Sequence, residues 1–357
     1  MSRNCAPRGR WTLLDNENPL MNTLLLRHWL FALMIALMIA LGASPLVADP
    51  LDDQRDALDE FAAHMAETHG LDRAGVNEIL KDARHQQGII DAITSPAEAL
   101  PWHRYRRIFL QEDRISEGAE FMAEHRELLE EIHGQYGVDA AILVAIVGVE
   151  TRYGQHPGQH RVLDALVTLA FDYPPRAGFF RSELEHFLLL ADEEDLDVSD
   201  IRGSYAGAMG IPQFISSSYR HYAVDGSGDG SRDLMNSVPD ALASVANYFA
   251  EHRWREGEPV VAPARVEDTD RVDEFLDDGM RLNTTVGELR AAGIKPEADF
   301  DDDASALLLA LDGDTETEHW IGLHNFRVIT RYNHSPLYAL ATYQLAGAIR
   351  DQDERNQ

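Results

Sequence analysis

Glu150 occupies an unusual position for a carboxylate, because it directly follows an uninterrupted apolar segment. Residues 140–149 read Ala-Ala-Ile-Leu-Val-Ala-Ile-Val-Gly-Val, and a helix that is apolar on all sides is buried. Turn signals follow at residues 153–158, so we expect Glu150 at or near the end of a core helix. A carboxyl group held in a partly apolar cleft tends to stay protonated near neutral pH, as a general acid must. The alternative is a helix-end glutamate that turns out to solvent, and spacing alone leaves it open.

A second group of oxygen-bearing residues has the spacing of a calcium loop. Residues 225–233 read Asp-Gly-Ser-Gly-Asp-Gly-Ser-Arg-Asp. They place oxygen side chains at positions 1, 3 and 5, the carbonyl of Ser231 at position 7 and Gly230 at the sharp turn of position 6, as in an EF-hand. Position 12 is Asn236, and the next carboxylate that could close the shell is Asp240, so the loop is longer than the standard form. A solvated acidic turn is the alternative.

Other metal and thiol chemistry finds little support. His156 and His160 are four residues apart, but Pro157 and Gly158 lie between them, so a helical geometry that aims both at one metal is not expected. The single cysteine, Cys5, precedes the apolar N-terminal segment. Disulfides, thiolate metal sites, cysteine nucleophiles and a lipid-bearing cysteine after that segment are therefore excluded.

The composition is that of a globular protein with a strongly acidic surface. In 357 residues, hydrophobic residues make up 45%, and 61 Asp and Glu face 31 Lys and Arg, which gives a formal net charge of −30. These proportions argue against wholesale disorder and a multi-span membrane protein. Such a surface repels phosphate backbones, so we expect no nucleic-acid partner. The acidity itself is interpreted as an adaptation for solubility.

The N-terminus has the layout of a secretory signal. A mostly basic stretch precedes an uncharged apolar run over 29–43, and small residues lead to Ala48, where a peptidase could cut. An uncleaved membrane anchor is the alternative, because residues 29–48 are nearly long enough to span a bilayer. The short apolar run and Pro45 favour cleavage. Residues 1–48 are excluded from the fold in either case.

The remaining sequence predicts a mainly α protein with a small β-rich insertion. Apolar residues recur at helical spacing over 51–84, 117–137 and 337–349. Residues 257–320 hold prolines, many acids and a short strand at 306–311, which suits a small mixed or β-rich unit. Residues 101–107 are aromatic and basic, and a packed connector is one interpretation of them.

Six motifs follow one another in a recognisable order. They are Gly148–Gly154 (GVETRYG), Gly203–Gly210 (GSYAGAMG), Gln213-Phe214 with Ser217-Ser218-Tyr219, the loop from Asp225, Ala246–Phe249 (ANYF) and Thr330–Ser335 (TRYNHS). In this order they resemble the membrane-bound lytic transglycosylase B family. The likeness runs from about Pro101 to Ile349, which is most of the chain after the predicted signal.

The resemblance implies a goose-lysozyme-like helical core with an added α-helical domain and a small β domain. We expect a signal peptide or anchor at 1–48, an α-helical domain at 49–130, a lysozyme-like catalytic core with the EF-hand-like loop at 131–256, a β-rich domain at 257–320, and a return to the core with a C-terminal helix at 321–357. Mainly α (α+β) is the fold class that follows.

The resemblance also implies the activity, which is cleavage of the bond between N-acetylmuramic acid and N-acetylglucosamine in peptidoglycan with formation of a 1,6-anhydro end. Glu150 matches the family's single catalytic glutamate, first as general acid and then as general base. The residues that match substrate-binding positions are Tyr105, Arg176, Ser204, Gln213, Tyr248, Tyr332 and Asn333. For the two tyrosines at 248 and 332, ordinary core packing is the alternative.

The family's calcium ligands match Asp225, Ser227, Asp229, the carbonyl of Ser231, and Asp240. One extra residue precedes Asp240, which puts this last ligand in question. We expect structural Ca²⁺, no organic cofactor, glycan strands as the partner, and a monomer in the periplasm. The protein is expected to be soluble or held at the membrane by its N-terminal segment, since the lipid-attachment cysteine is missing.

Two alternatives remain for the function. One is a hydrolytic muramidase of the same fold, in which Glu150 would activate water. The other is a non-catalytic module that binds the cell wall. Five positive residues are expected near the cleft, namely Arg104, Arg106, Arg107, Arg152 and Arg176. Because an acidic body faces an anionic polymer, we expect activity to rise with ionic strength over the low range.

Overall fold

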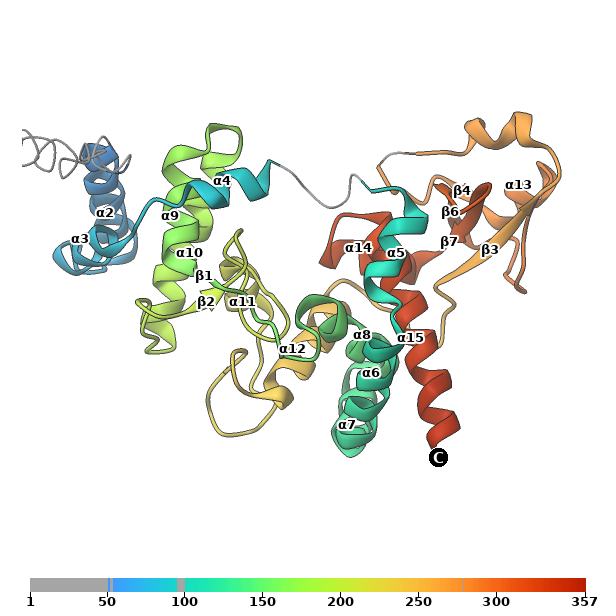
Figure 1. The fold of residues 1–357 in the computed structure, drawn as a ribbon, viewed down its shortest axis with the longest axis horizontal. Helices are drawn as coiled ribbons and strands as arrows, with labels where there is room; N and C mark the ends of the chain where they lie inside the picture. Colours follow the sequence, from blue (N-terminus) through green and yellow to red (C-terminus); the bar gives the residue numbers. More distant parts are fainter. Residues whose placement is uncertain (1–50, 52–53, 95–99, 278) are drawn as a thin grey trace, which may run out of the picture. The chain divides into compact units, whose positions relative to one another are not determined.

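The computed structural model describes residues 51, 54–94, 100–277 and 279–357 (Figure 1), so the predicted signal at 1–48 lies outside it. The N-terminal helices are α2 Arg55–His69, α3 Arg73–Asp82, α4 Gln87–Ile93, α5 Trp102–Phe109, α6 Glu112–Glu124, α7 Arg126–Tyr136 and α8 Ala140–Thr151. They are followed by β1 His160–Arg161, α9 Val162–Asp172, η3 Pro174–Arg176, α10 Ala177–Glu193, β2 Arg202–Gly203, α11 Ser216–Tyr222 and α12 Val238–Glu251. The last elements are β3 Val261–Val266, η4 Thr269–Glu274, β4 Thr284–Thr285, α13 Val286–Ala291, β5 Ile294–Pro296, β6 Ser305–Asp312, β7 Thr317–Gly322, α14 His324–Tyr332 and α15 Pro336–Asn356.

Helix α8 is the buried helix that the apolar segment predicts. Its N-cap is Asp139, whose carboxylate accepts a hydrogen bond from the Ala141 amide at 2.9 Å, and every residue from Ala141 to Gly148 is buried. The helix ends at Thr151, because the C-cap residue Arg152 has a left-handed backbone conformation (φ 51°) that cannot continue it. Around it pack α6, α12 and α15. This environment places the last turn of α8, with Glu150, at the edge of the core.

Apolar side chains gather in two large clusters. The first surrounds α8 with α5, α7, α12, α14 and α15, and the second joins α2, α3 and α4 to α9, α10 and α11. Tyr332 packs against both clusters. Residues 49–130 are thus divided between them, with α2–α4 in the second cluster and α5–α7 in the first. The predicted domain boundaries stay a prediction, and the packing shows one body in which early helices cover both parts of the core.

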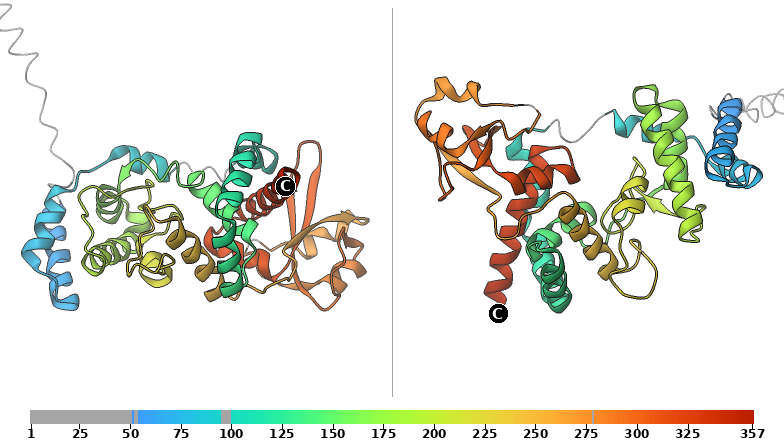
Figure 2. Two further views of the ribbon diagram at one scale, coloured as in Figure 1. Left: turned by 90° about the horizontal axis from the view of Figure 1, so that it is seen from below. Right: turned by 180° about the vertical axis from the view of Figure 1, so that it is seen from behind.

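The β-rich insertion is an antiparallel sheet with strand order β4-β6-β7-β3-β5. The predicted strand at 306–311 lies within β6, where Leu308 pairs with Ile321 of β7. Alternate apolar side chains of β6 enter two different clusters, because successive residues of a strand point to opposite faces. Leu308 joins the sheet's own cluster, whereas Leu307 and Leu309 join the cluster around α8. Figure 2 shows the sheet with α13 beside it, in contact with β4 and β5.

The two ends of the insertion are tied together by one buried side chain. The Asn325 carbonyl oxygen accepts a hydrogen bond from the Arg255 amide at 3.0 Å, and its amide group donates to the carbonyls of Arg255 (2.8 Å) and Glu258 (3.1 Å). Asn325 lies in the first turn of α14. The insertion therefore leaves and re-enters the helical body at one fixed place, and α14 begins there.

Residues 101–107 are helical, because they form most of α5. Trp102 and Tyr105 of this helix are buried in the first cluster, while Arg106 pairs with Asp314 and Glu318 of the sheet region. The segment thus packs as the connector interpretation requires, in the form of a helix. Within the described ranges, no single helix has the length and apolarity to cross a bilayer; α7 and α8 meet the criteria only as a pair, bent by 111°.

Candidate active site

The carboxyl group of Glu150 has one side-chain hydrogen-bond partner, and that partner is neutral. The Tyr338 hydroxyl donates to Glu150 Oε1 at 2.6 Å. Tyr338 is buried in the first turn of α15, behind the N-cap Ser335. In the part of the chain that the structure describes, no Lys, Arg or His forms an ion pair with Glu150. Burial raises the pKa of Glu150 to about 7, and the hydrogen bond from Tyr338 opposes this rise.

Aromatic rings pack beside this carboxyl group. The rings of Tyr332 and Tyr338 are nearly parallel, with centroids 6.5 Å apart, and Phe249 stacks on Tyr332 at 5.9 Å. Tyr248 meets the Tyr332 ring edge-on at 5.1 Å. Burial, and then the negative charge of Glu150, raise the pKa of Tyr332 and Tyr338 well above the usual value. Both hydroxyl groups therefore stay protonated wherever Glu150 titrates.

The hydroxyl groups of the two predicted subsite tyrosines are engaged with the backbone. Tyr332 donates to the Pro212 carbonyl at 2.5 Å, and Tyr248 donates to the Arg331 carbonyl at 2.6 Å. Tyr248 is buried, and Tyr332 is partly buried. These contacts are the core packing that the sequence left open as an alternative. They leave to a sugar only the exposed part of the Tyr332 ring.

The glycine-rich segment places Ser204 and Gln213. A Cβ on Gly158 would come within 2.0 Å of the Gly203 carbonyl oxygen. The segments around residues 158 and 203 can therefore approach this closely only with glycine at position 158. The Ser204 hydroxyl accepts hydrogen bonds from the amides of Ala206 (3.2 Å) and Ala208 (3.0 Å). These bonds fix the turn that carries it.

Gln213 is held in a left-handed conformation, with φ 52°. Its amide group donates to the carbonyls of Pro157 and Gly210, both at 2.9 Å. Within the described ranges, the side-chain carbonyl oxygen of Gln213 has no partner, so this oxygen is the group that a ligand could meet. The strained backbone of a non-glycine residue here is consistent with a positioned polar side chain.

The other predicted substrate residues are spread over three elements. Tyr105 is buried in α5, and it is among the groups close enough to Tyr338 to raise the pKa of that tyrosine. Asn333 follows α14, is partly buried, and accepts a backbone bond from Ser335 at 2.7 Å. Arg176 is exposed in η3, with its guanidinium over the ring of Phe179 at 4.3 Å. The structure thus brings Tyr105 and Tyr332 to the neighbourhood of Glu150 and Tyr338, and it shows no contact between Arg176 and Glu150.

Tyr338 is the site residue that sequence reasoning missed. The helical pattern from residue 337 includes it, yet nothing marks it as different from a core tyrosine. Its position three residues after the N-cap Ser335 of α15 is the one available signal, because a side chain in the first turn of a buried helix can face the end of another helix.

Most of the arginines expected beside the site are already paired. Arg152 binds Asp113 and Glu117 of α6, Arg106 binds Asp314 and Glu318, and Arg107 binds Asp314. An arginine whose guanidinium is paired with a carboxylate adds little net positive charge at its position. The expected rise of activity with ionic strength stays a prediction.

The loop from Asp225 is built around one carboxylate. Asp225 accepts hydrogen bonds from the Ser227 hydroxyl and from the amides of Gly228, Asp229 and Gly230, and the bond from Gly230 contributes most to lowering its pKa. Gly228 and Gly230 have left-handed backbones, as the sharp turn requires. The loop is thus formed with Asp225 ionised.

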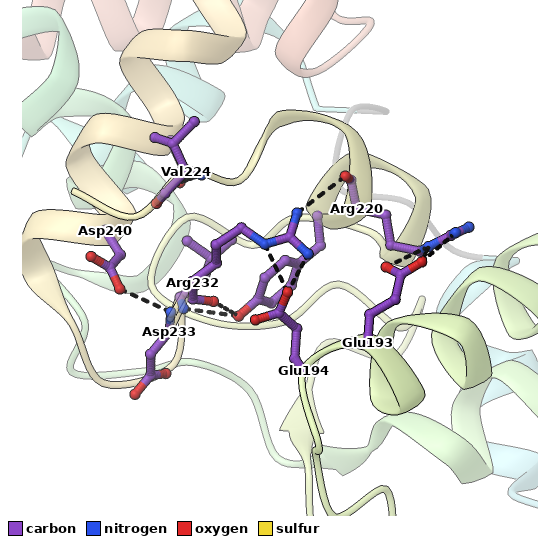
Figure 3. A network of polar contacts seen from close by, with 10 residues as sticks. Glu193, Glu194, Arg220, Val224, Arg232, Asp233 and Asp240 are labelled. Atoms are coloured by element: carbon purple, nitrogen blue, oxygen red, sulfur yellow. Dashed lines mark hydrogen bonds and ion pairs between the residues drawn. The ribbon is translucent and has the colours of Figure 1, made fainter. Parts of the chain in front are cut away.

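Asp240 is a buried brace of the same loop. Its two oxygens accept the amides of Ser227 (2.8 Å) and Asp233 (2.9 Å), and Figure 3 shows the second of these bonds beside the ion pair of Arg232 with Glu194. Among the described residues, the carboxylates of the loop do not form a trio with ligand atoms within 4.8 Å. The donor types fit calcium, since Asp225 Oδ2 and the two Asp240 oxygens each accept one N–H and still offer a lone pair.

The fold and the site together define a lysozyme-like enzyme that cleaves glycan chains, with one carboxyl group set among tyrosines. Residues 53–347 match the transglycosylase SLT domain family, and the chain belongs to this family of lytic transglycosylases, which act on peptidoglycan. The membrane-bound lytic murein transglycosylase B of Escherichia coli (strain K12) is 40% identical over 300 residues, covering 81% of each chain. The family, fold class and enzymatic nature predicted from the sequence are confirmed.

Solved structures of lytic transglycosylases have the same fold as this chain. Soluble lytic transglycosylase SltB1 from Pseudomonas aeruginosa has a TM-score of 0.79 and 45% identity, covering 84% of this chain and all of its own. Escherichia coli lytic transglycosylase Slt35, in complex with calcium, has a TM-score of 0.77 and 39% identity, covering 88% and 96%. SltB3 from Pseudomonas aeruginosa, in complex with NAG-NAM-pentapeptide, has a TM-score of 0.74 and 31% identity, covering 84% and 79%.

Proposed function

We propose that this transglycosylase cleaves the β-1,4 bond between N-acetylmuramic acid and N-acetylglucosamine and leaves a 1,6-anhydro end, with Glu150 as the only general acid and base. The observation that carries the proposal is the environment of Glu150. Its pKa of about 7 results from burial, and its side-chain partner is the neutral Tyr338. The group can therefore be protonated and ionised in turn at neutral pH.

The two half-steps use one proton in sequence. Protonated Glu150 donates to the bridging oxygen as the bond from this oxygen to C1 breaks. The resulting carboxylate then takes the proton of the sugar's own 6-hydroxyl as that oxygen attacks C1 and closes the anhydro ring. No water is consumed, so a second carboxylate, which most glycosidases need, has no task here. In the described residues, no second Asp or Glu perturbs the pKa of Glu150.

Tyr338 supports both half-steps from one position. Its hydroxyl holds Glu150 Oε1 at 2.6 Å, which fixes the direction of the carboxyl group and leaves Oε2 to the substrate. Because the donated hydrogen bond favours the ionised form, it also stabilises the carboxylate that the second half-step requires. Tyr338 is thus a positioning residue for the acid and base.

For the substrate, we propose glycan strands bound by the residues that the motifs indicate. The free carbonyl oxygen of Gln213 and the amide of Asn333 suit N-acetyl and hydroxyl groups, while the Tyr332 ring suits a sugar face. Arg176, exposed over Phe179, suits an acidic group on a peptide stem. The complex of SltB3 with NAG-NAM-pentapeptide supports this substrate class. We further propose export to the periplasm, as a monomer, with the N-terminal segment as the route for any membrane association.

Calcium is proposed as a structural ion in the loop from Asp225, held by Asp225, Ser227, Asp229 and the Ser231 carbonyl, with Asp240 closing the shell. The calcium complex of Slt35 supports it. Calcium should raise the melting temperature, because binding to the folded state alone stabilises it, and Asp225→Asn should remove the rise. Asp197→Asn, an exposed aspartate outside the loop, is the control. Calorimetry in chelator and in calcium that shows the same melting temperature would mean an empty loop.

The experiment that tests the reaction is mass spectrometry of muropeptides released from purified sacculi. Products that end in 1,6-anhydro-N-acetylmuramic acid are expected, and products with a reducing end, 18 mass units heavier by one added water, would instead identify a hydrolytic muramidase. Glu150→Gln should release neither product while still sedimenting with sacculi. Release by this variant would mean that another group is the acid.

A further inference from the structure

Two histidines and a glutamate converge on the outer side of the second cluster, away from the calcium loop and Glu150. His64 and His69 belong to α2, and Glu185 belongs to α10. His69 Nε2 lies 2.6 Å from Glu185 Oε1, and His64 Nε2 lies 3.3 Å from Glu185 Oε2. One ligand atom of each residue lies within 4.8 Å of both others. Among the described residues, no other trio of His, Cys, Asp or Glu side chains brings its ligand atoms this close together.

The donor set is that of a transition-metal site. Two imidazole nitrogens and a carboxylate oxygen suit Zn²⁺ and its neighbours, whereas Ca²⁺ and Mg²⁺ prefer oxygen alone. Tetrahedral ligands about 2.0 Å from Zn²⁺ lie about 3.3 Å from one another, so the distances here need only small side-chain movements. The side chains of His69 and Glu185 are 24% and 26% exposed, which leaves room for a metal ion and a water.

The surroundings orient the ligands and favour positive charge. The second ring nitrogen of His64, Nδ1, contacts the Thr68 hydroxyl at 3.2 Å, and a hydroxyl that accepts from Nδ1–H leaves Nε2 free to bind a metal ion. His69 is the last residue of α2, where the helix carbonyls attract a cation. Arg220 lies close enough to Glu185 for the carboxylate charge to raise the pKa of Arg220, but its guanidinium forms an ion pair with Glu193.

We propose that His64, His69 and Glu185 form a binding site for a divalent transition-metal ion, Zn²⁺ by its ligand chemistry, with water as the remaining ligand. The ion fastens α2 to α10 across more than a hundred residues of sequence. α2 also makes apolar contacts, such as that of Phe61 with Phe171, and its Asp59 pairs with Arg73 of α3. On α10, the Glu183 carboxylate accepts hydrogen bonds from the amide and the hydroxyl of Ser217 in α11. A metal ion on Glu185 would therefore stiffen the same helix that holds the motif containing Ser217.

The test is titration of the full chain with Zn²⁺ by calorimetry, after chelator treatment and with Ca²⁺ saturating the loop from Asp225. We expect one Zn²⁺ per chain, a melting temperature that rises with free Zn²⁺, and a tetrahedral absorption spectrum with Co²⁺. His69→Ala and Glu185→Gln should each weaken Zn²⁺ binding at least about tenfold.

The control is His133→Ala, which removes an exposed histidine of α7 and should bind Zn²⁺ like the native chain. Should either ligand variant fail to fold in the absence of metal, His64→Gln replaces it. Native-like Zn²⁺ binding by the ligand variants would overturn the location. Binding no tighter than that of Ca²⁺ would overturn the site and leave only a histidine–carboxylate ion pair. The readouts involve no catalysis, so the outcome is independent of the proposed reaction.

Discussion

Two glutamates close to the end of α8 have opposite environments. Glu117, on α6, receives two hydrogen bonds of 2.6 Å from the guanidinium of Arg152, which hold its pKa below the usual value. Glu150 is two residues before that same arginine in the sequence. It accepts a hydrogen bond from the Tyr338 hydroxyl instead, and burial raises its pKa to about 7. The comparison teaches that the partner, more than the residue type, decides which carboxylate can serve as an acid.

The backbone after α8 keeps the two environments apart. Arg152 and Tyr153 both have left-handed conformations, with φ of 51° and 60°, so the chain turns sharply after Thr151. Arg152 is thereby directed to α6, and the Tyr153 hydroxyl donates to the Arg114 carbonyl of α6 at 2.7 Å. The one cation near Glu150 in the sequence is thus bound elsewhere, and among the described residues no cation lowers the pKa of Glu150.

The largest expected effect is a difference in the rate of muropeptide release between a Glu150 variant and a Glu117 variant. Glu150→Gln should lower muropeptide release about 100- to 10,000-fold, since it removes the proposed acid and base. Glu117→Gln should leave release within about twofold, because it changes only a partly exposed ion pair. Initial rates of release from sacculi measure both. Equal losses in the two variants would mean that Glu150 has no special role.

A smaller effect is expected when the partner of Glu150 is changed. Tyr338→Phe should lower the rate about 10- to 100-fold through loss of orientation. It should also move the falling limb of the pH–rate profile, near pH 7 in the native enzyme, to higher pH. The sign follows because the lost hydrogen bond favoured the carboxylate, so its removal raises the pKa of Glu150 further.

Tyr343→Phe, a half-buried tyrosine on the same helix, is the control for this change and should keep the native profile. A Tyr338→Phe profile that moves to lower pH would contradict the role of the hydrogen bond.

The last prediction concerns the free energy of unfolding, which should depend on pH in opposite directions for Glu150 and Glu117. An unfolded glutamate ionises near pH 4.3, whereas folded Glu150 does so near pH 7. Its contribution is therefore full below about pH 4.3 and is lost as pH rises to 7, so Glu150→Gln should gain up to about 3 kcal/mol relative to the native protein across that range.

For Glu117, whose folded pKa is lowered, the contribution is present above pH 4.3 and is lost as pH falls through the folded pKa. Glu117→Gln should therefore lower the melting temperature at pH 7 and match the native protein in more acidic solution. Denaturant unfolding at several pH values measures both variants. Parallel trends would show that the two carboxylates share one environment.

The sequence allowed the prediction of features that depend on local pattern. An all-apolar decapeptide before Glu150 indicates a buried helix with a carboxyl group at its end, and Asp and Gly spacing indicates the loop from Asp225. Contacts between distant elements were not predictable. Tyr338 is 188 residues from Glu150, and Arg106 is 212 residues from Glu318, so each pairing depends on how helices dock. Asp240 braces backbone amides through burial, which no spacing rule reveals.

The hydrogen bond from Tyr338 to Glu150 also sets the order in which the protein can become active. A growing chain presents α8 long before α15 exists, and a contact of such high sequence separation forms late because a long loop must close. Until α15 docks, the carboxyl group lacks the hydroxyl that directs it. A chain that ends before α15 is therefore expected to cleave peptidoglycan poorly.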